Sequence, residues 1–316
     1  MNTEASTKSI KKRIFYTSCV AIFLTFVMIV LGGIVKNTGS SLACPDWPTC
    51  NGTLFPEMKG IVAIEHSHRL LGTLIGIIIC LLVLLSSKIR KIDSKLHKAT
   101  IVALVFVIIQ GIMGGATVLT QITPLYSTIH LALSHIFFAS LLYIYFETCG
   151  DSPADSTWPK VPTKLIKLSG IALALTFLQI LLGGIIRHYG AGPACGLGWE
   201  AAILCQELTT AKLTIWPMNG PGQLHMLHRL NGFFLLFALV GLTIPMLKFA
   251  RLNKLKSLRR HLIGIHLIVT VQVLLGIKVV GTYIAPLAIT LHLAFGLALW
   301  SLVAGLFFKL KGKHGK

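Results

Sequence analysis

Charged residues are scarce in this sequence. They occupy 12% of the 316 positions and only ten of them are acidic, whereas hydrophobic residues occupy 54%. A soluble domain carries about twice that share of charge, so the composition excludes an ordinary water-soluble protein. The apolar residues also lack the alternating pattern of a membrane β-barrel and form continuous runs instead. Each run is long enough for a helix of about 20 residues to cross a bilayer.

Eight apolar runs predict eight transmembrane helices, and therefore an all-α integral membrane protein. The first run follows basic residues, as a signal peptide does, but it is too long and ends without a small-residue cleavage site. We therefore expect it to remain as the first helix. The runs cover residues 14–35, 62–86, 99–119, 126–148, 165–187, 223–247, 261–281 and 287–308.

The net charge of +19 raises the question of a nucleic-acid partner, but the distribution of the charge argues against one. Most Lys and Arg residues lie in segments that alternate along the chain, so that all of them fall on one side of the membrane. The positive-inside rule assigns that side, and with it both termini, to the cytoplasm. We expect lipid and no nucleic acid as a partner. The basic segments are the N-terminus, residues 88–98, 160–167, 248–260 and the C-terminal tail.

Motifs of the first half of the chain recur in the same order in the second half, and the offset is 160 residues for the first histidine motif and 162 for the second. This nearly constant offset between the histidine motifs indicates duplication, which predicts two pseudo-symmetric four-helix bundles. The predicted units are residues 1–150 and 164–316, joined by a cytoplasmic linker at 151–163. Glycine pairs recur in the repeat and either let helices pack closely or leave room for a flat macrocycle. The matching segments are 31–36 and 182–187, 67–70 and 227–230, and 128–132 and 290–294.

Each half contributes two histidines at one predicted depth in the membrane: His68 and His130, then His228 and His292. Each pair comes from the second and fourth helices of its unit. Two imidazoles that face each other across a four-helix bundle are suitable axial ligands for heme iron, whereas zinc normally takes three or four protein ligands. A single histidine in a membrane helix is more often an interhelical hydrogen-bond donor. Four at one depth favour a porphyrin in each half.

The neighbours of these histidines differ between the halves. Glu65 precedes the first ligand by three residues, where the second half has His225, and this spacing places each on the helix face of its ligand. A partly desolvated carboxylate suits proton transfer or stabilisation of positive charge. The alternative is a glutamate in the first helical turn that faces water. Arg69 and Arg229 are candidates to contact a heme propionate, or to extend to lipid headgroups.

Four of the seven cysteines lie in the two long loops that we place outside the membrane. They are Cys44 and Cys50 in the first loop and Cys195 and Cys205 in the second. In an oxidising compartment each pair can close a small disulfide loop. The alternative is a zinc site with four thiolate ligands.

These residues resemble the heme A synthase family, the membrane enzymes that convert heme O to heme A for terminal oxidases. The resemblance covers nearly the whole chain. It rests on the glycine pair that leads into the Cys-Pro-Asp-Trp-Pro stretch at 44–48, on the Glu-x-x-His motif at 65–68, and on the two later histidine motifs. It implies an oxidoreductase that oxidises a methyl group of heme O to a formyl group through a hydroxymethyl stage, in the biogenesis of cytochrome oxidase.

The resemblance also implies roles for individual residues. His68 and His130 would bind the iron of the substrate heme O, Glu65 would be catalytic, and His228 and His292 would bind a resident heme b. It further implies the disulfides Cys44–Cys50 and Cys195–Cys205. A heme O synthase and an electron donor such as quinol are the protein and small-molecule partners that this chemistry suggests. No organelle-targeting extension is evident, which favours a bacterial-type plasma membrane.

Two other functions are alternatives to this hypothesis. A bis-histidine diheme electron carrier, similar to cytochrome b, accounts for the four histidines equally well but not for the contrast between Glu65 and His225. A repeat-based transporter is less consistent with the sequence, because transport sites usually lie at the membrane midplane in broken helices.

Overall fold

The computed structural model describes residues 3–149, 158–206 and 212–312. In this part of the chain, eight helices are long and apolar enough to cross a membrane, which confirms the predicted fold class. Each of them extends beyond its predicted apolar run at one or both ends. The helices are α1 (Thr3–Asn37), α2 (Gly60–Ser87), α3 (Ser94–Leu119), α4 (Pro124–Thr148), α5 (Thr163–His188), α6 (Gly220–Leu252), α7 (Lys256–Gly281) and α8 (Pro286–Gly312).

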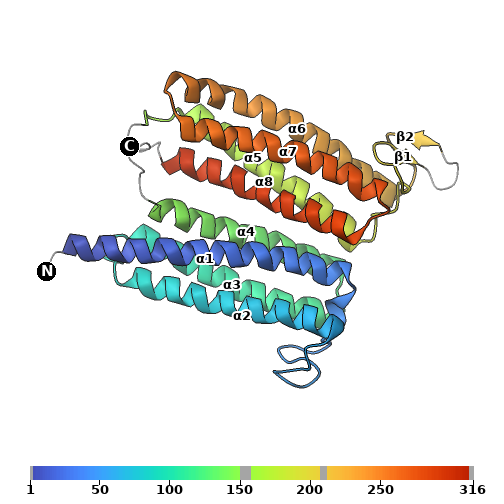
Figure 1. Ribbon diagram of the computed structural model, residues 1–316, viewed down its shortest axis with the longest axis horizontal. Coiled ribbons are helices and arrows are strands. Elements are labelled where there is room, and N and C mark those ends of the chain that lie inside the picture. Colours follow the sequence, from blue (N-terminus) through green and yellow to red (C-terminus); the bar gives the residue numbers. More distant parts are fainter. Residues whose placement is uncertain (1–2, 150–157, 207–211, 313–316) are drawn as a thin grey trace. The chain divides into compact units, whose positions relative to one another are not determined.

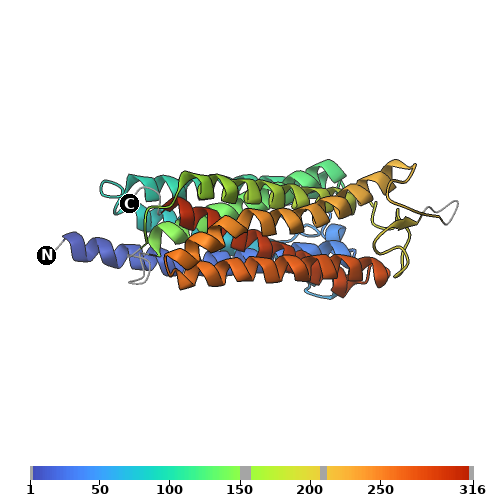
Figure 2. The same cartoon turned by 90° about the horizontal axis from the view of Figure 1, so that it is seen from above.

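The helices form two compact units, with the division between residues 157 and 158. In the first unit, α1 packs on α2, α2 on α3, α3 on α4 and α4 on α1, so that α2 and α4 lie on a diagonal of the bundle. In the second unit α5 to α8 follow the same order, and α6 and α8 lie on the diagonal. Figures 1 and 2 show the helices of each unit running side by side. Of the predicted linker, residues 151–157 lie outside the described part of the chain.

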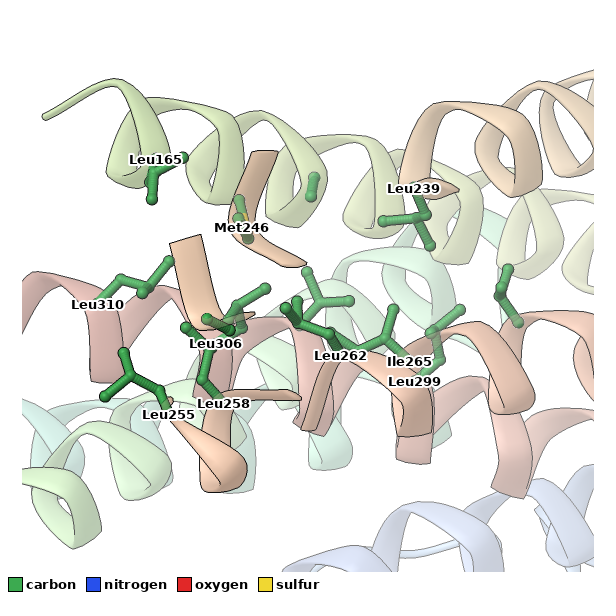
Figure 3. Packing of buried hydrophobic residues seen from close by; sticks show 14 of the residues in the cluster. Leu165, Leu239, Met246, Leu255, Leu258, Leu262, Ile265, Leu299, Leu306 and Leu310 are labelled. Atoms are coloured by element: carbon green, nitrogen blue, oxygen red, sulfur yellow. The ribbon is translucent and has the colours of Figure 1, made fainter. Parts of the chain in front are cut away.

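The hydrophobic core of each unit lies toward one end of its bundle. In the first unit it includes Ile14, Ile79 and Leu141, which lie on the side of the histidines away from the long loops. In the second unit the corresponding cluster includes Leu239 and Leu262 and is filled by leucines from all four helices (Figure 3). The loop-side end of each bundle therefore carries the histidines, while the opposite end supplies most of the apolar packing.

Two long loops close the histidine-bearing ends of the bundles. The first connects α1 to α2 and contains a short 3-10 helix, η1 (Ser40–Leu42). The second connects α5 to α6 and contains the antiparallel strands β1 (Cys205–Gln206) and β2 (Leu213–Thr214). After the second loop, Asn219 accepts a hydrogen bond from the backbone N–H of Gly222 and so begins α6. Each loop contains one disulfide, Cys44–Cys50 or Cys195–Cys205.

Candidate functional site

The two histidines of the second unit face each other across its diagonal. The ring centroids of His228 in α6 and His292 in α8 lie 6.5 Å apart, with an angle of 77° between the ring planes. A metal ion bound about 2 Å from a nitrogen of each imidazole would place the centroids roughly 6 Å apart. The described geometry therefore fits one iron shared by both rings. His68 in α2 and His130 in α4 occupy the corresponding diagonal positions in the first unit.

The four histidine rings share one feature, a buried nitrogen without a hydrogen-bond partner. Each imidazole is half-buried, and its Nδ1 atom is buried without a hydrogen-bond partner. A buried polar atom without a partner is costly, and coordination of a metal by the ring would offset part of that cost. The residues present therefore fit the bis-histidine porphyrin site that the sequence predicts in each unit.

A glycine on the neighbouring helix lies against each histidine ring. A Cβ atom added to Gly32 would lie 3.0 Å from Cε1 of His68, and one added to Gly183 would lie 3.0 Å from Cε1 of His228. The histidine on the fourth helix of each unit has the same arrangement. A Cβ atom added to Gly114 would lie 3.5 Å from Cε1 of His130, and one added to Gly276 would lie 3.2 Å from Cε1 of His292. These glycines therefore make room for the ligand rings, in addition to any role in helix packing.

Glutamines hold three of the four histidines in place. Gln110 donates to the carbonyl of His130 at 3.1 Å, Gln179 to that of His228 at 3.1 Å, and the amide of Gln272 lies 3.3 Å from Nε2 of His292. In α1, Met28 stands at the place that Gln179 takes in α5, and its methyl group lies near Gly72. The second unit thus fixes both of its histidines through glutamine, and the first unit only one.

Glu65 is buried and tied to the first loop. Its carboxylate accepts a hydrogen bond from the backbone N–H of Cys44 at 2.8 Å and pairs with the guanidinium of Arg69 at 2.7 Å. Arg69 also donates to the carbonyls of Cys44, Asp46 and Thr49, each at 2.7 Å. Glu65 therefore does not face water, and in this structure Arg69 contacts the loop instead of extending outward.

The second unit places His225 at the position of Glu65. His225 is buried, and its Nδ1 atom has no partner. Arg229 resembles Arg69 in donating to two loop carbonyls, those of Ala201 at 2.6 Å and Leu204 at 3.0 Å. Its Nε and Nη2 atoms, however, are buried without partners. Among the described residues, the carboxylate that satisfies Arg69 thus has no counterpart beside Arg229.

The first loop is organised around Asp46. Its carboxylate accepts hydrogen bonds from the hydroxyl of Thr49 and from the backbone N–H groups of Gly52 and Asn51. These donors lower the pKa of Asp46 to about 2. The next residue, Trp47, packs on α3, where a Cβ on Gly115 would lie 2.6 Å from the indole ring. The loop therefore covers the end of the bundle beside the histidines.

His66 packs against the disulfide of this loop, a contact that the sequence does not reveal. The ligand atoms of His66, Cys44 and Cys50 lie within 4.8 Å of one another, but the two sulfur atoms are bonded to each other and offer no thiolate to a metal. Both ring nitrogens of His66 are buried without partners. In the second unit Met226 packs against the other disulfide. Because each pair is bonded within itself, the structure does not support the four-thiolate zinc site.

The fold and the site define a class of protein: a duplicated membrane bundle with one histidine pair on a diagonal of each unit. The family model of COX15-CtaA, described as a cytochrome oxidase assembly protein, matches residues 16–304. The chain therefore belongs to this family, which confirms the resemblance drawn from its motifs.

Individual relatives carry the name heme A synthase. The protein from Exiguobacterium sibiricum is 33% identical over 226 residues, which are 68% of this chain and 70% of the relative. The protein from Symbiobacterium thermophilum is 28% identical over 64% of this chain and 65% of its own length. That from Exiguobacterium sp. is 30% identical over 62% and 64%. The matches thus span about two thirds of each relative. The eight spanning helices and these bacterial relatives support a multi-pass protein of the plasma membrane.

Proposed function

We propose that the chain is a heme A synthase, an oxidoreductase that converts a methyl group of heme O to the formyl group of heme A. The observation that carries the proposal is the difference between two units of common design. Both units place a histidine pair across a diagonal, with a glycine behind each ring. Only the first unit adds a buried carboxylate, Glu65, one helical turn before its histidine. The relatives named heme A synthase support the same activity.

The two units have separate roles in this proposal. The first, catalytic unit holds heme O between His68 and His130. The second holds a heme b between His228 and His292, and this heme would supply an electron-transfer centre. A pure electron carrier does not explain why a buried carboxylate stands beside the histidine of one unit and a histidine at the same place in the other, whereas an enzyme with one unit for chemistry and one for electron transfer does.

Glu65 is the residue that we assign to the reaction. Its carboxylate lies in a buried site and is held by the N–H of Cys44 and by Arg69, so its position is fixed before the substrate binds. A fixed carboxylate can stabilise positive charge that develops on the substrate, or accept a proton from it. Fixed groups of this kind need no rearrangement during the reaction.

The surroundings of the protein follow from its topology and substrate. Both termini face the cytoplasm and the two disulfide loops face outward, in accordance with the basic segments. Heme O enters from the lipid phase, delivered by a heme O synthase, and a redox partner such as quinol exchanges electrons with the heme of the second unit.

The direct test is to analyse the porphyrins of cells that make heme O and express the chain. Pyridine hemochrome spectra of the extracted pigment should show heme A, and the purified protein should contain heme b. If heme b is present but heme A does not appear, the chain is a bis-histidine electron carrier. If the purified protein is colourless when porphyrin is supplied, neither function holds.

A further inference from the structure

The terminal nitrogens of Arg69 have no hydrogen left for a ligand. A guanidinium has five N–H donors, two on each terminal nitrogen and one on Nε. Nη1 of Arg69 donates to the carbonyls of Asp46 and Thr49, and Nη2 donates to the carbonyl of Cys44 and to Oε1 of Glu65. An anion that approaches Nη2 would therefore have to displace the carboxylate of Glu65.

In Arg229, the edge of the guanidinium formed by Nε and Nη2 makes no hydrogen bond to the described residues, and we call it the open edge. Nη1 is fully used by the carbonyls of Ala201 and Leu204, but Nη2 and Nε have no partner and are shielded from solvent. These two nitrogens present parallel N–H groups, the arrangement that binds both oxygens of one carboxylate. Three buried donors without acceptors are costly, so this edge suits an anion that the described residues of the chain do not provide.

The position of Arg229 indicates the class of anion. Arg229 follows His228 directly in α6, and its Nη1 donates to carbonyls of the outer loop, so the guanidinium lies at the loop end of the bundle, next to the helix position of the proposed porphyrin ligand. A porphyrin such as heme b carries two propionate groups at one edge of its ring. A propionate of a porphyrin held by His228 is thus a carboxylate in reach of Nε and Nη2.

We propose that Arg229 binds a propionate of the porphyrin in the second unit, whereas in the first unit Glu65 already occupies the corresponding edge of Arg69. The second unit then holds its porphyrin by a charge-assisted contact that the first unit lacks. This difference makes one porphyrin resident and leaves the other free to exchange, as a substrate and product must. The inference rests on the proposed function, because it assigns the resident porphyrin to the second unit.

The contact can be measured by comparing heme b with its dimethyl ester, in which both propionates are uncharged. The full-length protein in detergent, freed of porphyrin, is reconstituted with each form, and affinity is followed by the absorbance of the bis-histidine complex. The wild type should bind heme b about 10- to 100-fold more tightly than the ester. Arg229→Gln should lose this preference, while Arg69→Gln should keep it.

His225→Glu gives an independent test that leaves the guanidinium in place. A glutamate at this position stands one turn before Arg229, as Glu65 does before Arg69, so it should close the open edge and reduce the preference for heme b. The reverse change, Glu65→His, should open the edge of Arg69 and raise the amount of porphyrin retained by the purified protein above one per chain.

The outcomes separate this inference from the proposed function. If the wild type binds heme b and the ester equally well, or if Arg229→Gln keeps the preference, the propionate contact is wrong while heme A synthesis can still stand. Loss of the preference in Arg69→Gln alone would assign the contact to the first unit and overturn the proposal. If the natural ligand of Nε and Nη2 is an anionic lipid, added phosphatidylglycerol should change the affinity for heme b, whereas esterification of the propionates should not. That result would also overturn the proposal.

Discussion

The ring of His228 lies so close to Gly183 that a Cβ atom at the glycine would be 3.0 Å from Cε1 of the imidazole. Very few side chains in proteins approach a neighbour this closely, so Gly183→Ala must push the ring out of its place. We expect the variant to lose most of its bound heme b, measured as the ratio of porphyrin to protein after purification. Gly241→Ala in the same helix as the histidine is the control, because a Cβ there meets nothing within 4 Å. Equal heme content in the two variants would contradict the role of Gly183.

Glu65 and His225 occupy matching positions, which allows a matched pair of substitutions. Glu65→Gln removes the negative charge but keeps an acceptor for the N–H of Cys44. We expect heme A formation to fall about 100-fold or more, as is usual when a group that acts on protons or charge in the reaction is removed, while heme b stays bound. His225→Gln should leave heme A formation much higher than in Glu65→Gln. Chromatography of extracted porphyrins measures both, and unchanged heme A yield in Glu65→Gln would remove Glu65 from the mechanism.

Asp46 gives the first loop a defined response to acid. The hydroxyl of Thr49 and two backbone N–H groups hold its pKa at about 2, below the ordinary value of 3.8. The ionised carboxylate therefore stabilises the folded loop fully above the ordinary value, and this contribution is lost as the pH falls toward 2. The fluorescence of the neighbouring Trp47, obtained as the difference from Trp47→Phe, should be constant from pH 7 to 5 and change only below about pH 4. In Asp46→Asn this transition should be absent, and a transition near pH 6 in the wild type would point to another group.

The sequence was sufficient to predict the helices and the placement of one histidine on each of the second and fourth helices of a unit, because both depend on patterns with a direct physical cause. Apolar runs of membrane length fix α1 to α8, and duplication places His68 and His228, or His130 and His292, at matching points. The contacts of the arginines could not be predicted in the same way. Whether Arg69 meets a loop carbonyl or a ligand depends on the path of the loop, which no periodicity encodes.

The residues against which an individual helix residue packs could not be predicted from the sequence either. His66 lies between Glu65 and His68 in the sequence, yet it packs against a disulfide whose location is set by the loop. The only sequence signal was its place in the repeat, where the second unit has Met226, a residue that also packs on its disulfide. The repeat shows that His66 and Met226 stand at equivalent positions, but only the structure shows that each packs against a disulfide.

Trp47 lies closer to the level of the histidines than its counterpart in the second loop. It packs on Gly115, the residue next to the glycine that faces His130, whereas Trp199 packs on Gly281, five residues beyond the glycine that faces His292. At about 1.5 Å per residue, this difference of four residues places the indole about 6 Å closer to the level of the histidines. The first loop therefore covers the histidine site more deeply than the second loop covers its own.

Gly115→Ala tests whether this depth matters. A Cβ on Gly115 would lie 2.6 Å from Cδ2 of Trp47, so the indole and the loop that carries it must move away from α3. We expect heme A formation to fall several-fold while heme b bound at the second unit is unchanged, because only the cover of the catalytic unit is disturbed. Gly111→Ala, one turn earlier on α3 with nothing within 4 Å of its added Cβ, should retain activity. If both alanine variants form heme A at the wild-type rate, Trp47 is a packing residue of the loop and takes no part in holding the substrate.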